Sequence, residues 1–354
     1  MRHLRVSVAA LLVGASVALG ACQPVPATGQ SGFSLISTEE ERRMGAEADP
    51  EIQAAFGGPY HDARLQAYVA GLGQRLVGVS ELAGQPFRFL VLDSPIVNAM
   101  ALPGGYVYVT RGLVALADDE AELAGVIGHE IGHVTGRHTA QRQSQAIAAN
   151  VLAGLLGVLS GVPAAGDLAG VGAAAYLQSY SRDQESEADG LGIRYLARAG
   201  WDPEAMASFL AKLRAQSQLE AALAGQSPDS VDQSSLWASH PRTHDRVREA
   251  AAEARHTAQA GAASLGRGNR DAFLARLDGL SYGGGVTRNA KGKTTTTPAP
   301  HRVAVVTVQA GDTVASLAAR MPYDDGFAEQ RLRVLNGLDD DDRLRPGQRI
   351  KTIR

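Results

Sequence analysis

The sequence predicts an α+β protein, with a mainly helical domain that contains a small sheet and a compact C-terminal domain. Apolar residues recur at helical spacing through most of the chain. Short runs rich in strand-forming residues between 87 and 110 predict the sheet. Residues 303–354 follow a stretch rich in Gly, Thr and Pro, and they have the pattern strand, helix, helix, strand.

The composition is that of an ordinary globular protein. The chain has 354 residues, 20% of them charged, and 34 Lys and Arg balance 37 Asp and Glu to give a net charge of -3. Nucleic acid is excluded as an expected partner, because binding a phosphate backbone requires a clustered positive surface. The single cysteine cannot form an intramolecular disulfide.

The N-terminal residues predict a signal peptide over 1–21. Arg2 and Arg5 precede an apolar run that is too short for a comfortable membrane span. The small residues before Cys22 resemble the lipobox of bacterial lipoproteins, which implies that Cys22 carries the lipid. Gln23 then favours the outer membrane, with the protein facing the periplasm of the bacterial cell envelope. The alternative is a secreted protein with an unmodified cysteine.

The expected elements follow in order along the mature chain. Residues 22–36 are expected to form a tether, and Ser37 followed by three glutamates has the pattern of a helix start. Asp119, with Glu122 three residues later, has the spacing of a capping box. The expected helices are 61–77, 119–134, 143–160, 167–180, 183–199 and 203–222, the last with Asp202 as N-cap and Pro203 as first residue, and the expected strands are 87–92, 98–102 and 106–110.

One segment between Arg142 and Asp167 is ambiguous. Its 24 residues carry no charge, which raises the question of a membrane helix. Asn150, Ser160 and many Gly and Ala make it only weakly hydrophobic. We therefore expect buried helices here rather than a membrane span.

His129, Glu130 and His133 form an H-E-x-x-H pattern on an expected helix. Residues four apart lie on one helix face, so both imidazoles can reach one zinc while the glutamate lies beside a water on that metal. Two solvated helix histidines are the alternative. The apolar flanks weaken it, because they would bury an imidazole pair that needs a partner.

A catalytic zinc needs a third protein ligand. Glu185, on a later expected helix, offers a carboxylate, and Asp189 one turn further on could accept a proton from a ligand imidazole. Taken alone, this cluster is more simply a solvated acidic helix face.

Together these motifs resemble the gluzincin metallopeptidase family that contains the HtpX-type heat-shock proteases and the CAAX prenyl endopeptidases, in its periplasmic lipoprotein branch. The resemblance runs from about residue 37 to 251. The matching stretches are His129 to His133, Glu185 to Asp189, Asn98-Ala99 with Pro103-Gly104-Gly105 and Gly112-Leu113, Ala199 to Pro203, and Ser239-His240-Pro241 with Arg246.

The resemblance implies a zincin-type domain in which His129, His133 and Glu185 bind one zinc per chain. It implies that Glu130 is general base and later proton donor, and that His240 lies close to the metal. His240 would either donate to the developing oxyanion or occupy the open coordination position as an inhibitory ligand, and a capping role beside a helix start is a further alternative.

Two further sets of residues complete the expected site. Asp189 and Arg246 are expected to support the ligands, with Arg246 mainly structural. An extended substrate is expected along the edge strand, where main-chain hydrogen bonds serve any peptide sequence. The expected substrate-binding residues are Asn98, Ala99 and Met100.

The C-terminal segment resembles a LysM domain, whose usual ligand is the N-acetylglucosamine backbone of peptidoglycan. Asn336-Gly337-Leu338 and Leu344 to Gln348 carry this resemblance. A longer segment at 321–328 and an acidic run at 339–342 depart from the usual pattern. We expect peptidoglycan binding, and the alternative is a degenerate module that packs on the protease.

The predicted organisation is a signal peptide (1–21), a tether (22–36), a zinc metallopeptidase domain (37–280), a flexible linker (281–302) and a LysM-like domain (303–354). The predicted function is that of a lipid-anchored zinc endopeptidase that cleaves misfolded or misassembled envelope proteins. One alternative is a non-catalytic chaperone or peptidoglycan-tethered scaffold in which His240 closes the zinc site. Another is a peptidoglycan peptidase.

Overall fold

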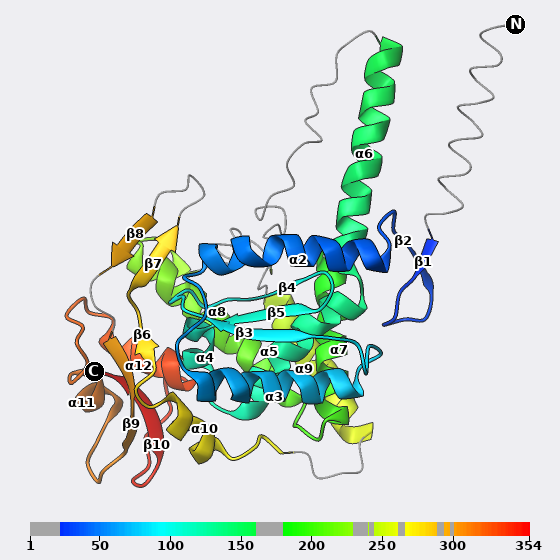
Figure 1. Cartoon of the computed structure of the whole chain (residues 1–354). Helices are drawn as coiled ribbons and strands as arrows, with labels where there is room; N and C mark the ends of the chain where they lie inside the picture. Colours follow the sequence, from blue (N-terminus) through cyan, green and yellow to red (C-terminus); the bar gives the residue numbers. More distant parts are fainter. Residues whose placement is uncertain are drawn as a thin grey trace, which may run out of the picture.

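A computed structural model of the protein describes residues 22–160, 180–228, 240, 244–260, 266–288, 294–297 and 301–354. The signal peptide expected at 1–21 lies outside the described residues, as does almost all of the helix expected at 167–180. The α+β class is confirmed, because helices dominate and the strands form small sheets (Figure 1).

A three-stranded sheet lies at the centre of the first domain. Its order is β3 (Arg88–Leu92), β5 (Tyr106–Thr110), β4 (Ala99–Leu102), with β3 parallel and β4 antiparallel to β5. In Figure 1 the sheet lies between α2 (Thr38–Ala55) and α3 (Ala63–Val79). β4 is therefore an edge strand, as the sequence predicted.

The helix starts largely agree with the capping signals in the sequence. Ser37 accepts a hydrogen bond from the Glu40 amide at the start of α2, and Asp119 accepts one from the Glu122 amide at the start of α5 (Glu120–Thr135). The expectation for α8 (Glu204–Leu223) was wrong by one residue, because its N-cap is Pro203. Asp202 accepts from the Glu204 amide instead.

The helix α6 (His138–Ser160) differs from the expectation of burial. Gln145–Val151 are exposed or half-buried, and Val151 is 63% exposed. Figure 1 shows α6 projecting away from the body of the domain. Among the described residues, no helix combines the length and the apolar character that crossing a membrane requires. Apolar composition did not reveal that this helix leaves the core.

Three helices were not predicted. They are α4 (Arg111–Leu116), α9 (His244–Ala260) and α10 (Arg270–Leu277). In α9 the buried apolar positions include Ala250 and Ala254, and such small side chains give a weak hydrophobic pattern. It packs against the two helices that precede it in the chain, α7 (Arg182–Arg198) and α8.

The C-terminal segment has the predicted order of elements. β9 (His301–Thr307), α11 (Val314–Ala318), α12 (Ala328–Asn336) and β10 (Arg349–Ile353) follow one another, and β9 pairs with β10. Gly337 ends α12 with a φ of 58°, a left-handed conformation that glycine adopts readily.

The segments expected as tether and linker contain strands that their composition did not predict. β1 (Cys22–Pro24) and β2 (Ser31–Phe33) form an antiparallel hairpin in the expected tether. In the expected linker, β6 (Ser281–Tyr282) pairs with β9, and β7 (Gly285–Arg288) pairs with β8 (Thr294–Thr297).

A buried lysine joins the C-terminal segment to the first domain. Lys351 on β10 is fully buried, and its Nζ donates to the carbonyls of Ala115, Leu116 and Ala117 at 2.9, 2.9 and 2.6 Å. Asp118 lies 3.0 Å from the same ammonium and 2.6 Å from Lys212 of α8. The two parts of the chain therefore share one charged, buried contact.

Candidate metal centre

The close packing of α5 against α7 brings the predicted ligands together. Gly128 and Gly132 on α5 face Gly192 and Ala188 on α7, and a Cβ added at Gly192 would lie 3.0 Å from the His129 amide nitrogen. A side chain in such a gap would force the facing backbone to move by a few tenths of an ångström. The glycines thus allow side chains from the two helices to converge.

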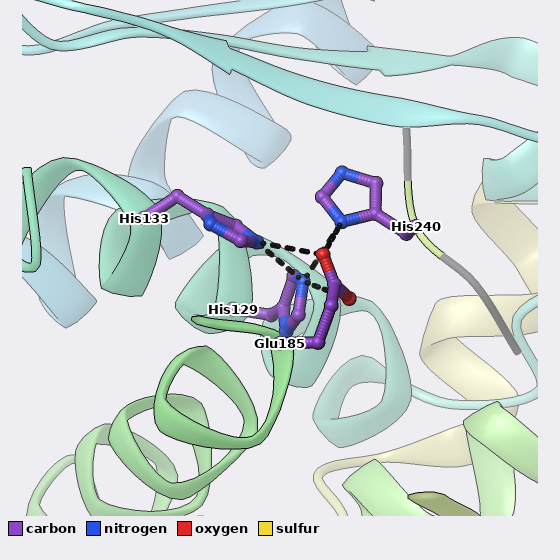
Figure 2. Close-up of side chains that lie close together, drawn as sticks. All are labelled: His129, His133, Glu185 and His240. Atoms are coloured by element: carbon purple, nitrogen blue, oxygen red, sulfur yellow. Dashed lines mark hydrogen bonds and ion pairs between the residues drawn. The ribbon is translucent and has the colours of Figure 1, made fainter. Parts of the chain in front are cut away.

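His129, His133 and Glu185 converge on one buried point (Figure 2). The two Nε2 atoms are 3.0 Å apart, Glu185 Oε1 lies 3.5 Å from His133 Nε2, and Glu185 Oε2 lies 3.7 Å from His129 Nε2. With His240, their donor atoms all lie within 4.8 Å of one another.

These donors fit zinc. Tetrahedral bonds of 2.0–2.1 Å to zinc would separate the ligand atoms by about 3.4 Å, close to the separations between these donors. Burial lowers the pKa of His133 well below its usual value, so its imidazole is neutral and carries a lone pair for a metal. Two imidazoles and one carboxylate are a usual ligand set for a catalytic zinc.

Asp189 and Arg246 support this cluster. Asp189 Oδ1 accepts from His129 Nδ1 at 2.8 Å, which in the neutral imidazole leaves the lone pair on Nε2, facing the other donors. Arg246 Nε donates to Asp189 at 2.7 Å, and its guanidinium lies 2.5 Å from Glu185. Burial raises the pKa of Asp189, but Arg246 and the hydrogen bond from His129 together lower it more, so the carboxylate stays charged.

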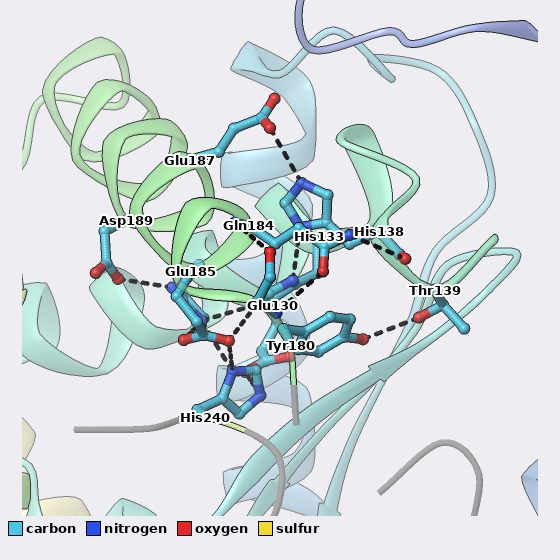
Figure 3. A network of polar contacts seen from close by, with 12 residues as sticks. Glu130, His133, His138, Thr139, Tyr180, Gln184, Glu185, Glu187, Asp189 and His240 are labelled. Carbon is cyan, nitrogen blue, oxygen red and sulfur yellow. Dashed lines mark hydrogen bonds and ion pairs between the residues drawn. The ribbon is translucent and has the colours of Figure 1, made fainter. Parts of the chain in front are cut away.

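A second chain of hydrogen bonds, through His138 and Glu187, orients His133 (Figure 3), and no sequence pattern predicted it. His133 Nδ1 lies 2.8 Å from His138 Nδ1, and His138 Nε2 lies 3.3 Å from Glu187. A carboxylate only accepts, so we assign the proton of His138 to Nε2 and that of His133 to Nδ1. The Nε2 atom of His133 is then free to bind a metal. The tyrosine Tyr180 stacks on the same ring, with centroids 3.9 Å apart.

Glu130 lies beside the cluster and is 2% exposed. Its Oε2 has no hydrogen-bond partner among the described residues, which is unusual for a buried carboxylate. Burial raises its pKa, and the nearby imidazoles of His240 and His129 only partly oppose this. An unpartnered buried carboxylate of raised pKa is a group able to take up a proton.

The structure brings His240 into the donor cluster. Its Nδ1 lies 2.8 Å from Glu185 Oε1 and 3.3 Å from His129 Nε2, and its Nε2 lies 3.5 Å from Glu130. The imidazole thus contacts two of the three predicted ligands and the predicted base.

Two cavities adjoin the centre along β4. Asn98 and Ala99 line a cavity of about 30 Å³ together with His129, Glu130, His240 and apolar residues of α8. A larger cavity of about 200 Å³ lies beyond the other end of β4 and includes His133, Pro24 and Pro26. Met100 packs instead among Ile52, Phe56 and Tyr108, because successive strand residues point to opposite faces.

Comparisons with known proteins agree with this geometry. The profile of Peptidase family M48 matches residues 63–254, and that of the LysM domain matches 306–352. The beta-barrel assembly-enhancing proteases of Yersinia pestis and Escherichia coli are 36% and 31% identical to this chain over 204 and 236 residues. These regions cover 55% and 61% of this chain, but only 42% and 48% of the relatives.

A mitochondrial protein is also similar to this chain. The mitochondrial metalloendopeptidase OMA1 of Schizosaccharomyces pombe is 28% identical over 235 residues, which cover 64% of each chain. The chain spans less than half the length of the two bacterial relatives. Because the M48 match covers more than half of this chain and includes the metal cluster, the resemblance seen in the sequence is confirmed: the chain belongs to peptidase family M48, whose members are zinc metallopeptidases, and carries a LysM domain.

Proposed function

We propose that this protein is a zinc-dependent endopeptidase whose ligands are His129, His133 and Glu185. The observation that carries the proposal is the meeting of these three donors with the buried Glu130 carboxylate, whose Oε2 has no hydrogen-bond partner among the described residues. A merely structural zinc site is closed by four ligands and needs no such carboxylate.

Different residues of the chain have different roles in the proposed hydrolysis. When bound, zinc would polarise a peptide carbonyl and acidify a water molecule. Glu130 takes the proton from that water and delivers it to the leaving amine. Asp189 keeps His129 in the tautomer that binds, and the edge of β4 at Asn98 and Ala99 holds the peptide by its main chain.

The test is a zinc assay combined with cleavage of casein. Glu130→Gln keeps the volume of the side chain and removes the base, so zinc content should remain stoichiometric while cleavage falls by at least about 100-fold. Unchanged cleavage would disprove the assignment of Glu130. Loss of zinc would place Glu130 among the ligands.

A second candidate function is a latent enzyme in which His240 is a fourth zinc ligand. It is favoured by the 2.8 Å and 3.3 Å separations of His240 Nδ1 from Glu185 and His129, which match those among the other donors. Oxyanion stabilisation is the alternative. His240→Ala should raise cleavage if the imidazole blocks the site, and lower it if the imidazole donates to the oxyanion. No cleavage in either form would favour a non-catalytic scaffold.

We further propose that the enzyme acts in the bacterial cell envelope, anchored at a lipidated Cys22 to the outer membrane and facing the periplasm. Relatives named beta-barrel assembly-enhancing protease support misassembled envelope proteins as substrates. Mass spectrometry of the N-terminal peptide tests lipidation. Accumulated substrates in cells that produce only Glu130→Gln would identify the targets.

The LysM domain supports binding to peptidoglycan. We propose division into a peptidase domain (37–280) and a LysM domain (303–354) joined through 281–302. Co-sedimentation of the protein with isolated sacculi tests binding. Digestion of isolated muropeptides tests the alternative that peptidoglycan itself is the substrate.

A further inference from the structure

We propose that the β1–β2 hairpin and α6 together form a surface that docks onto a phospholipid bilayer. The surface is made of Phe33, Leu35, Ile147 and Val151, and we call it the docking face. A lipid surface is a separate ligand from the peptide substrate of the metal centre.

The four side chains are apolar and open to solvent. Phe33 is 44% exposed, Leu35 36%, Ile147 39% and Val151 63%. In the described part of the chain only Ile96 and Leu223 are comparable large apolar side chains at this exposure. Four of these six exposed apolar side chains thus come from two segments that are more than a hundred residues apart in sequence. Exposed apolar groups gathered in this way mark interaction surfaces.

Hydrogen bonding joins the two segments into one surface. The Leu35 amide donates to Ser144 Oγ at 2.9 Å, which fixes the end of the hairpin against α6. Ile147 and Val151 follow Ser144 by three and seven residues, so they continue the same stripe of the helix. Figure 1 shows the hairpin beside the base of α6, which projects outward.

The charge pattern favours a bilayer as the occupant. Neither residues 22–36 nor residues 143–166 contain a single Asp, Glu, Lys or Arg. An apolar stripe without charges can enter the boundary between headgroups and acyl chains at little electrostatic cost. No described helix could span the membrane, so α6 would lie shallowly in that boundary.

The hairpin also carries the predicted lipid attachment point. Cys22 on β1 pairs directly with Phe33 on β2. A lipid on Cys22 would therefore enter the bilayer beside the docking face, and the face would fix the orientation that a single anchor leaves free. The inference does not depend on this lipid, because the four side chains are exposed without it.

Docking would bring the metal centre close to the membrane surface. The first residue of α6 is His138, whose Nδ1 lies 2.8 Å from the Nδ1 of His133. Pro24, the last residue of the hairpin strand β1, and Pro26 line the same cavity as His133. The substrates best placed for this centre are chains that emerge from, or lie on, a bilayer.

A fluorescent probe can report on the docking face of the mature chain. Cys22 is the only cysteine, so Cys22→Ser gives a background without thiol or lipid. Val151→Cys then carries an environment-sensitive NBD label, and Leu223→Cys on α8, 38% exposed in the native chain, is the matched control. The probe ligand is a vesicle of phosphatidylethanolamine and phosphatidylglycerol. We expect a blue shift and increased emission at position 151 and none at position 223.

Vesicle flotation gives a second readout with unlabelled protein. Ile147→Glu with Val151→Glu should reduce the bound fraction at least about tenfold, while Leu223→Glu should leave it unchanged. Circular dichroism of all variants shows whether they are folded. Because both substituted side chains are exposed, we expect native spectra.

Three outcomes would overturn the proposal. They are the absence of a shift at position 151, an equal shift at both labelled positions, and a shift without vesicles that grows with protein concentration and so indicates a second copy of the chain. Casein cleavage by the double variant separates this proposal from the proposed activity, since loss of docking should leave cleavage in solution intact.

Discussion

The imidazole of His133 is held in place by residues that do not themselves reach the proposed zinc. His138 binds its Nδ1, and Tyr180 covers one face of its ring. Such partners fix the tautomer and direction of a metal-binding histidine. The residues around a ligand therefore help to determine how well it binds.

We predict that His138→Ala lowers zinc affinity by about 10–100-fold without removing a ligand. Glu187→Gln should have a smaller effect, because the Glu187 side chain is 37% exposed and water can replace its carboxylate as a partner of His138. Competition with a chelator measures the affinity. His256→Ala, on the exposed side of α9, is the control. Equal affinities for wild type and His138→Ala would show that this chain of hydrogen bonds is dispensable.

Among single residues, the sequence predicted the members of the site that lie at regular spacing within one helix. It did not predict His138, whose position depends on a turn of the backbone. His129, Glu130 and His133 lie within a single helix, so their spacing alone predicts a shared face. His138 returns to the site only because Arg137 adopts a left-handed conformation with φ of 55°. A φ of this sign is uncommon for arginine, and nothing in the local sequence indicates it.

At the scale of elements, the distance between α5 and α7 determines whether the ligands meet. His129 and His133 come from α5, and Glu185 comes from α7. The contact between these helices depends on residues with little or no side chain. Any side chain that separates the helices would also separate the donors.

We predict that Gly192→Val destabilises the fold by about 1–3 kcal/mol and lowers zinc affinity, because the new side chain would press on the α5 backbone. A Cβ added at Gly190 on the same helix would meet no atom within 4 Å, so Gly190→Val is the matched control. Urea unfolding and the chelator competition measure both effects. Valine has a higher helix propensity than glycine, so propensity alone should not destabilise either variant. Equal losses in the two variants would contradict a specific contact between position 192 and α5.

The elements that were predicted well are those with a strong local signal. The three strands of the central sheet and the capped starts of α2 and α5 are of this kind. The burial of α6 was predicted wrongly, because an apolar helix is equally compatible with a core and with an outward-facing surface. Its true position depends on tertiary contacts that the local sequence does not encode.

At the scale of the whole molecule, Lys351 joins the LysM domain to the peptidase domain. Its three carbonyl acceptors lie just before Asp118 and Asp119, at the entry to the helix that carries His129. Packing of the module on the protease was one of the alternatives considered from the sequence. The residues that make this contact are more than 230 positions apart, so no local pattern could indicate it.

We predict that Lys351→Met destabilises the protein by about 3 kcal/mol, since buried carbonyls and part of the Asp118 carboxylate lose their partner. Urea unfolding followed by circular dichroism measures this loss. Arg343→Met, at an exposed position of the same domain, should change stability by less than about 0.5 kcal/mol. Similar stabilities for wild type and Lys351→Met would show that the buried contact contributes nothing.

The same contact predicts a dependence of stability on pH. Burial raises the pKa of Asp118, but Lys351 and Lys212 lower it more, to about 2 from an ordinary value of 3.8. A depressed carboxyl pKa stabilises the fold above the unfolded value, and about 2 kcal/mol is lost as pH falls from about 4 to about 2. The free energy of unfolding measured across this range should fall less steeply for Asp118→Asn. Parallel curves would contradict the assignment.

The position of Lys351 in the chain also has a consequence for the order in which the protein is assembled. Chains are synthesised from the N-terminus, so His129, His133, Glu185 and His240 all emerge before Lys351. A growing chain thus possesses its complete set of metal donors while the carbonyls at the end of α4 still lack the cation that pairs with them. The chain therefore acquires its metal donors before it acquires the buried contact that stabilises the fold around them.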